Sequence, residues 1–268
     1  MQKEVAGDRG GLGLIVVIAL ALGMSNAFAT SLPITDSGVL QIGNLQGSLV
    51  GLTADPFCFN WGGGSTCVAG TTHQMAVSGS SNVFSTAPSA SDQIKDLTNF
   101  GPLVDFETVL GAGALAGQTV HFDLVSLVLP NGGAGFGNCG SDAANNSCSP
   151  AGAPVVLTED ATGTQVTASF TALLDAYTGT NSNFTPYRGL FTTQFSGTLV
   201  GAGACNGLAA NITNIVGCEG NQGTIRSTWS ATESPIPPVP EPRSTALLLG
   251  SSLLGFVVYK RRSFRRAV

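Results

Sequence analysis

The sequence predicts an all-β protein, built as a single β-sandwich with Greek-key or jelly-roll-like connections, one short helix and disulfide-closed loops. Three observations support this class. Apolar and polar residues alternate with period two through most of the chain, as half-buried strands require. Glycine is abundant, at 36 of 268 residues, and turn residues interrupt the alternation at frequent intervals. Six cysteines fall into three local pairs, each of which encloses a short loop.

The longest predicted strand covers residues 118–129. Val120, Phe122, Leu124 and Val128 share one face of it, which indicates a strand that packs on the core. The opposite face becomes apolar after Asp123, so we expect a central strand that is covered on both faces toward its end. The other strand candidates show the same alternation, and they are residues 104–108, 155–159, 164–170, 188–199 and 224–229.

Two hairpins and one helix complete the prediction. The turn at residues 160–163 separates two alternating segments and ends on Gly163. Residues 40–53 are expected to form a second hairpin, with its turn at Gly43-Asn44. Residues 91–99 are expected to form the helix, because Ser91 is a suitable N-cap and an acidic residue follows it in the first turn.

The N-terminus has the layout of a signal peptide. A weakly basic start precedes an apolar segment at residues 12–22, and Ala27 and Ala29 form a small-x-small cleavage site. We therefore expect residues 1–29 to be removed, so that the mature chain begins at Thr30.

The C-terminus has the layout of a sorting tail. A proline-rich linker at residues 234–243 contains the motif Val239-Pro240-Glu241-Pro242. The tail that follows, residues 244–268, consists of an apolar segment at 245–259 and a basic run at 260–266.

This tail resembles the PEP-CTERM signal of Gram-negative bacteria that make exopolysaccharide. The resemblance implies that an exosortase-type transpeptidase recognises the motif, and that the protein passes through the inner membrane to the cell surface or extracellular matrix. The apolar segment spans about 23 Å as a helix, whereas a bilayer core is about 30 Å thick. Its length therefore favours a transmembrane helix that is used transiently and removed. A permanent single-pass anchor with a cytoplasmic C-terminus is the alternative.

The body of the chain, residues 30–233, reads as one ectodomain because no internal linker divides it. It also resembles exported proteins that carry this tail, although no activity comes with that resemblance. The shared features are the strand Phe122-Asp123-Leu124, the loop between Cys139 and Cys148, the hairpin Leu157-Thr158-Glu159-Asp160 and the strand Thr193-Gln194-Phe195.

The cysteines are expected to form three local disulfides. An even number of cysteines in an exported chain indicates disulfide bonds, and isolated pairs favour bridges between nearest neighbours. Zinc sites need closer spacing or nearby histidines, so we expect neither a metal nor a cofactor. The predicted bridges are Cys58–Cys67, Cys139–Cys148 and Cys205–Cys218.

The charge of the body is strongly negative. Between residues 30 and 233, three basic residues stand against thirteen acidic ones, which gives a net charge of −10, whereas the whole chain has −5. Proteins that bind nucleic acid present basic surfaces to the phosphates. The composition therefore argues against nucleic acid as a partner.

Few residues suggest chemistry. The chain contains no Gly-x-Ser-x-Gly, His-Glu-x-x-His, Walker or EF-hand motif. His121 and Asp123 lie two positions apart on one strand, as do Asp105 and Glu107, so each pair is expected to share a strand face. Such pairs can ligate a cation or transfer protons. The simpler interpretation is hydrogen-bonded positions on an outer face.

Trp61 is the candidate ligand-stacking residue. It lies beside three glycines in the first predicted disulfide loop, where its indole could stack on a sugar or a partner protein. The alternative is a loop tip that folds back on the edge of the sandwich.

Together these observations predict a non-enzymatic structural or interaction protein of the cell surface or matrix. A glycan-binding module that retains exopolysaccharide is the alternative, and a polysaccharide hydrolase is the weaker one. A hydrolase should bring two carboxylates together in a cleft, and a glycan-binding module should present an exposed aromatic platform with polar neighbours. A structural protein should show neither.

Overall fold

The computed structural model describes residues 39–44, 50–54, 57–62, 68–80, 83–98, 101–180, 183–219 and 224–237. The predicted signal peptide, the motif at 239–242, the tail and Cys67 lie outside these ranges. Within them, no helix has both the length and the apolar character needed to cross a membrane.

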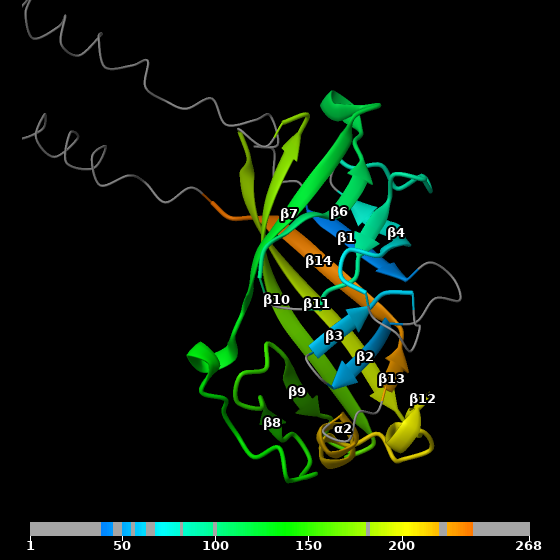
Figure 1. Ribbon diagram of the computed structural model, residues 1–268, viewed down its shortest axis with the longest axis vertical. Coiled ribbons are helices and arrows are strands. Elements are labelled where there is room, and N and C mark those ends of the chain that lie inside the picture. Colours follow the sequence, from blue (N-terminus) through cyan, green and yellow to red (C-terminus); the bar gives the residue numbers. More distant parts are fainter. Residues whose placement is uncertain are drawn as a thin grey trace, which may run out of the picture.

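Eight antiparallel strands of the described chain close into a β-barrel (Figure 1). Around the barrel the order is β11-β14-β1-β4-β5-β6-β7-β10, and β10 pairs back with β11. The predicted open sandwich is therefore wrong, although the chain is mostly β as expected. The barrel strands are β1 (Leu40–Asn44), β4 (Thr72–Ser80), β5 (Gln93–Lys95), β6 (Leu103–Leu110), β7 (Thr119–Val128), β10 (Gln165–Thr178), β11 (Thr185–Ser196) and β14 (Trp229–Pro235).

The long β10–β11 hairpin closes the barrel. These two strands pair along almost their whole length, while β10 also pairs with β7 and β11 also pairs with β14. A sandwich would leave two of these edges unpaired. Both architectures bury every second residue of each strand. The alternation in the sequence therefore could not distinguish a closed barrel from an open sandwich.

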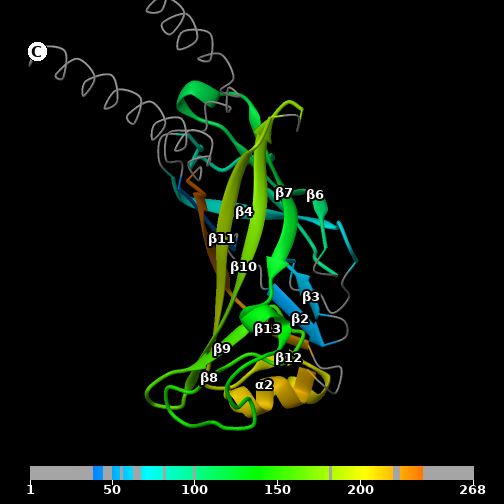
Figure 2. The same ribbon diagram turned by 90° about the vertical axis from the view of Figure 1, so that its left-hand side faces the viewer.

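A smaller sheet, two short strands and a helix complete the structure. Figures 1 and 2 place β8, β9, β12 and α2 together at one end of the barrel, and we call this region the clipped end. The smaller sheet has the order β12-β13-β2-β3, and β8 and β9 extend the barrel sheet from β10. The elements are β2 (Val50–Ala54), β3 (Phe57–Asn60), β8 (Ser147–Cys148), β9 (Val156–Glu159), β12 (Val200–Ala202), β13 (Thr224–Ser227), α2 (Ile212–Glu219) and the 3₁₀ turns η2 (Gly113–Leu115), η3 (Pro130–Gly133) and η4 (Gly203–Cys205).

The inward-facing side chains form one hydrophobic core. Along β11, for example, Tyr187, Phe191 and Phe195 are buried together with Gly189 and Thr193, and the residues that alternate with them are exposed or half-buried. Each buried side chain of this size stabilises the fold by about 1.5–3 kcal/mol relative to an exposed one. The predicted alternation at residues 188–199 is therefore confirmed.

The hairpin predicted at residues 155–170 is also confirmed. β9 pairs with the first part of β10, with Glu159 opposite Val166. The Asp160 side chain accepts the backbone N–H of Thr164 at 2.9 Å, and Gly163 adopts a positive φ of 68°. Glycine adopts this left-handed conformation without steric cost.

Two local predictions are wrong. Residues 93–95 of the expected helix form β5, which pairs with β4 and β6. Asp92 does not start a helix, because it accepts backbone N–H groups of Ser89 and Leu110 and so joins two distant segments. The expected hairpin at 40–53 does not form either, since β1 pairs with β4 and β14 whereas β2 belongs to the smaller sheet. In both cases long-range strand pairing overrides a local signal.

Two β-bulges change which residues face outward. In β6 the pairing with β7 passes from Leu103 opposite Leu124 to Glu107 opposite Phe122, so extra residues of β6 bulge out. In β7, Val125 is left out of the pairing with β10 and is 41% exposed. The expectation that this strand is covered on both faces toward its end is therefore wrong.

Two of the predicted disulfides are confirmed. Cys139 is bonded to Cys148 and Cys205 is bonded to Cys218, with Cα separations of 5.4 and 5.0 Å. Both bridges lie in the clipped end. The predicted bridge to Cys67 lies outside the described residues.

The N-terminus of α2 ties the clipped end together. The backbone N–H of Ile212 donates to Glu159 of β9 at 3.1 Å. That of Thr213 donates at 2.8 Å to Asp142, which lies in the loop that the Cys139–Cys148 disulfide closes. The Asn211 side chain accepts a third N–H of this turn at 2.8 Å. These bonds pair N–H groups that a helix leaves open. Burial raises the pKa of Glu159.

Candidate functional site

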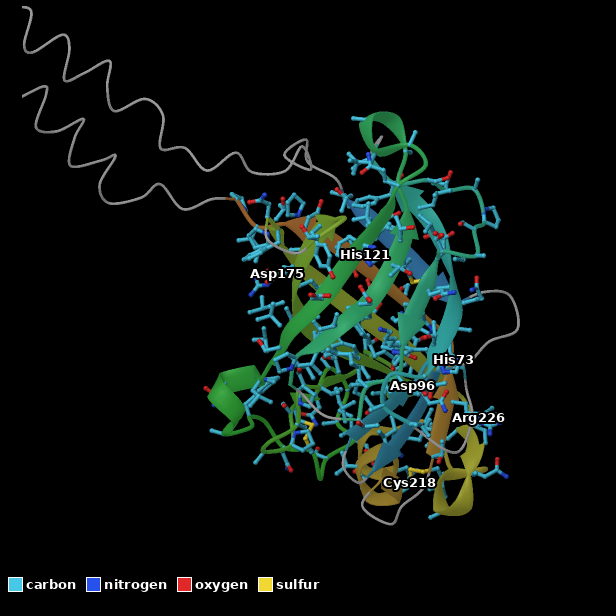
Figure 3. The ribbon with its side chains drawn as sticks, turned by 45° about the horizontal axis from the view of Figure 1, so that its top comes forward. His73, Asp96, His121, Asp175, Cys218 and Arg226 are labelled. Atoms are coloured by element: carbon cyan, nitrogen blue, oxygen red, sulfur yellow. A yellow bond between two sulfur atoms is a disulfide. The ribbon has the colours of Figure 1, made fainter. Side chains whose placement is uncertain are left out.

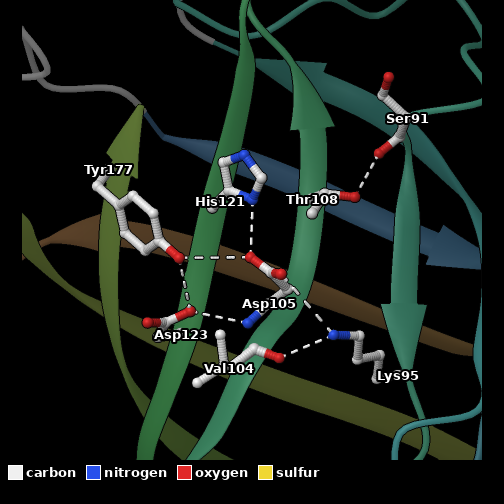
Figure 4. A network of polar contacts seen from close by, with 8 residues as sticks. All are labelled: Ser91, Lys95, Val104, Asp105, Thr108, His121, Asp123 and Tyr177. Atoms are coloured by element: carbon white, nitrogen blue, oxygen red, sulfur yellow. Dashed lines mark hydrogen bonds and ion pairs between the residues drawn. The ribbon is translucent and has the colours of Figure 1, made fainter. Parts of the chain in front are cut away.

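The barrel carries a polar network on the outer face of β6, β7 and β10 (Figure 4). His121 Nδ1 lies 2.7 Å from Asp105 Oδ1. The Tyr177 hydroxyl donates to Asp123 at 3.1 Å and to Asp105 at 3.4 Å, and its ring stacks on the His121 ring with centroids 5.3 Å apart. The predicted His121 and Asp123 pair thus shares an outer face, where Asp105 of β6 joins it.

This network holds the β6 bulge in place. Asp105 has a φ of 50°, which non-glycine residues rarely adopt. Its backbone N–H donates to Asp123 at 2.8 Å, while its carboxylate lies 4.0 Å from the Lys95 ammonium. Lys95 also donates to the Val104 carbonyl at 2.8 Å. Each of these polar groups therefore has a partner within the protein. The simplest role of the network is to stabilise the β6 bulge.

A further carboxylate lies beside the network. Asp175 of β10 is opposite Asp123 of β7, and burial together with the charge of Asp123 raises the pKa of Asp175. In the described part of the chain, no group of three or more histidine, cysteine or acidic side chains is arranged to hold a metal ion.

Glu107 does not share a face with Asp105. The bulge between them turns Glu107 into the barrel, where it has no exposed surface, whereas the Asp105 side chain is 37% exposed. Glu107 lies there beside Glu233 of β14, which is also fully buried. Burial, and then the neighbouring Glu233, raise the pKa of Glu107 well above its usual range, while burial raises that of Glu233 to about 7. The expected surface pair is thus replaced by a buried carboxyl pair.

The surroundings of this carboxyl pair are closely packed. Gly189 of β11 lies opposite Glu233, and a Cβ at that position would come within 3.3 Å of the Glu233 side chain. The buried Tyr187 ring packs edge-on against Phe122 at 5.4 Å. Burial, with the Glu233 charge as a second cause, raises the pKa of Tyr187. Neither carboxyl group of the pair is exposed to solvent in the described structure.

Trp61 lies in the core and is only 2% exposed. Its indole N–H donates to the Lys95 carbonyl at 2.8 Å, and its backbone N–H donates to the buried Asp96 carboxylate at 2.9 Å. His73 approaches the same carboxylate at 2.9 Å (Figure 3). Gly62 leaves the space for His73, because a Cβ there would lie 2.4 Å from the imidazole. The indole of Trp61 is therefore buried in the barrel core and is not exposed for stacking on a ligand.

The aromatic cluster around Trp61 leaves little free space. Its ring lies 4.6 Å from that of Trp229 and 5.6 Å from that of Phe191. The crevice among these rings has a volume of about 20 Å³, close to the minimum for a single water molecule. A sugar ring does not fit there.

A polar groove of about 280 Å³ lies beside β13. It lies between the end of β11, the segment that leads into β12, and the β13–β14 junction. Phe195 and Leu199 are buried, and the polar residues around them are exposed or half-buried. We call this the Arg226 groove, and its lining residues are Gln194, Phe195, Ser196, Thr198, Leu199, Val200, Arg226, Ser227 and Thr228.

Sequence reasoning missed this groove. Its residues come from two segments about thirty positions apart, and they meet because β13 pairs with β12 and β14 pairs with β11. The sequence signal that bears on this groove is the alternation along β11, which places the side chains of Gln194 and Ser196 on the surface. Tyr177 lies in the outer network and Tyr187 lies in the barrel interior, and neither lines this groove.

Comparison with protein-family models, with curated proteins and with solved structures finds no match for this chain.

Proposed function

We propose that this chain is an exported protein of the cell surface or extracellular matrix that acts by binding, with the Arg226 groove as its contact for exopolysaccharide. The groove is the observation that carries this proposal. It combines open volume with hydroxyl and amide side chains that can donate to and accept from sugar hydroxyls.

Export is supported by features outside and inside the barrel. The sequence has a small-x-small cleavage site ending at Ala29 and a tail that resembles an exosortase substrate. The clipped end contains two disulfides, which persist mainly in oxidising compartments outside the cytoplasm. Intact-mass analysis of protein from the native host should find a chain that begins at Thr30 and lacks the basic tail. A mature species that retains Arg265 and Arg266 would indicate a permanent anchor.

A purely structural role is the second candidate. The observation that favours it is the clipped end, where two disulfides and the three bonds at the N-terminus of α2 fix the loops. A hydrolase is supported less, because the carboxyl pair of Glu107 and Glu233 is enclosed by the barrel.

A variant with a bulky side chain in the groove distinguishes a binding role from a purely structural one. The full chain with Thr198→Trp, which places an indole in the groove, should lose retention on the host's own exopolysaccharide. Thr86→Trp is the matched control, since Thr86 is also exposed but does not line the groove. If both variants are retained like the parent protein, the groove is not the contact and the structural role is favoured. Release of shorter sugars by the purified protein would instead indicate a hydrolase.

A further inference from the structure

We propose that the Arg226 groove recognises a carboxylate-bearing sugar, such as a uronic acid residue, and that the Arg226 guanidinium binds the carboxylate. This inference rests on the proposed function, because it names the ligand class of the same groove.

Arg226 brings the only charge to the lining of this groove. The lining residues include no aspartate or glutamate. Within the described chain, Arg226 has no carboxylate within ion-pair distance, and its buried Nε has no hydrogen-bond partner. An unpaired donor that is removed from water costs free energy. The Arg226 guanidinium can therefore donate hydrogen bonds to an acceptor group of a bound ligand.

The other cations of the described chain are placed differently. Lys95 is held in the outer network by the Val104 carbonyl and Asp105. Arg188 is exposed on the outward face of β11 and does not line the groove. Figure 3 shows Arg226 near the clipped end, well away from His121 and Asp175 of the network. Among these cations of the described chain, Arg226 is therefore the one that lines the groove.

The chemistry of the lining fits a sugar acid. A guanidinium is planar and can bind a carboxylate through two parallel hydrogen bonds. Gln194 and Thr228 also line the groove, and their amide and hydroxyl groups can bond to ring hydroxyls. The buried Phe195 and Leu199 give the groove an apolar floor, against which the C–H face of a sugar ring can pack.

The charge of the rest of the body limits the ligand further. A net charge of −10 between residues 30 and 233 repels a densely charged polyanion. Charges separated by more than about 8 Å are largely screened at physiological ionic strength. We therefore expect a polymer in which isolated carboxylates are spaced by neutral sugars, rather than a continuous polyuronate.

The test is a calorimetric comparison of two probes with the full chain. One probe is a β-linked glucose tetrasaccharide in which one residue is glucuronic acid, and the other is its carboxyl-reduced, neutral form. Charge-assisted hydrogen bonds are stronger than neutral ones by an amount that corresponds to a factor of about ten. The parent protein should bind the acidic probe about ten-fold more tightly than the neutral one, and the difference should shrink with added salt.

Arg226→Gln should reduce binding of the acidic probe to the level of the neutral probe and leave the neutral probe unaffected. Arg226→Lys should keep only part of the preference, because an ammonium lacks the planar fork. Arg188→Gln is the control and should change neither affinity. Equal binding of both probes by the parent protein, or an unchanged preference in Arg226→Gln, would overturn this inference while the proposed function stands. Binding of neither probe, together with no retention on host polysaccharide, would overturn both.

Discussion

Glu107 and Glu233 form a buried carboxyl pair that joins opposite parts of the barrel wall, one from β6 and one from β14, and neither side chain has exposed surface. Burial penalises the charged form of each group, and the neighbouring carboxylate adds repulsion when both ionise. The pair is therefore most stable when it holds at least one proton.

The stability of the barrel should fall as the pH rises. The pKa of Glu233 is raised from 4.5 to about 7 in the folded protein, so the folded state binds more protons than the unfolded state in this interval. The stabilisation that protonated Glu233 gives to the folded state is fully present below pH 4.5, and it is lost as the pH rises through about 7. The expected loss is about 3 kcal/mol, and urea unfolding between pH 4.5 and 8.5 measures it.

The matched variant for this prediction is Glu107→Gln. A neutral amide next to Glu233 removes the repulsion between two carboxylates, so the free energy of unfolding should depend less on pH than in the parent protein. Asp160→Asn changes an exposed carboxylate of a hairpin turn and should leave this pH dependence in place. A parent protein that gains stability between pH 5 and 8 would show that the pair does not titrate in this way.

Trp61 should matter for folding and not for ligand binding. Its side chain packs against Phe59, Phe191 and Trp229 and has almost no exposed surface. Trp61→Ala should therefore lower the free energy of unfolding by about 3–5 kcal/mol. Phe136→Ala is the comparison, because Phe136 is 39% exposed and should cost much less. Folded Trp61→Ala protein should retain the parent's affinity for exopolysaccharide. A selective loss of that affinity would show that the indole takes part in binding and would contradict this prediction.

The disulfide between Cys205 and Cys218 should stabilise the clipped end. The bridge closes a loop with a sequence separation of 13, for which chain entropy gives about 3 kcal/mol. The double variant Cys205→Ser and Cys218→Ser should lose up to this amount in chemical denaturation. Peptide mapping without reduction should recover the pairs Cys139–Cys148 and Cys205–Cys218, and it also tests the predicted pair of Cys58 and Cys67. A peptide that links cysteines of different loops would contradict the local pairing.

Much of the strand content could be predicted from the sequence, because side-chain alternation is a local property. Val120 and Phe122 lie on the core side of their strand, as the alternation predicts. Closure of the barrel could not be predicted, since it depends on β10 and β11 finding partners far away in sequence.

The candidate sites were harder to predict than the strands. Asp105 and Glu107 should share a face in a regular strand, but the bulge at Asp105 sends them to opposite sides of the barrel wall. The sequence does not signal this bulge, because its left-handed residue is an aspartate and not a glycine. The Arg226 groove was missed because it requires the pairing of β12 with β13.

The most direct test of binding at the groove is hydrogen–deuterium exchange of the full chain with and without the host's exopolysaccharide. We predict slower exchange at residues 194–200 and 226–228, which line the groove, and unchanged exchange around His121 and Tyr177 in the outer network. Protection confined to the outer network, or no protection anywhere despite saturating polysaccharide, would contradict the proposed function.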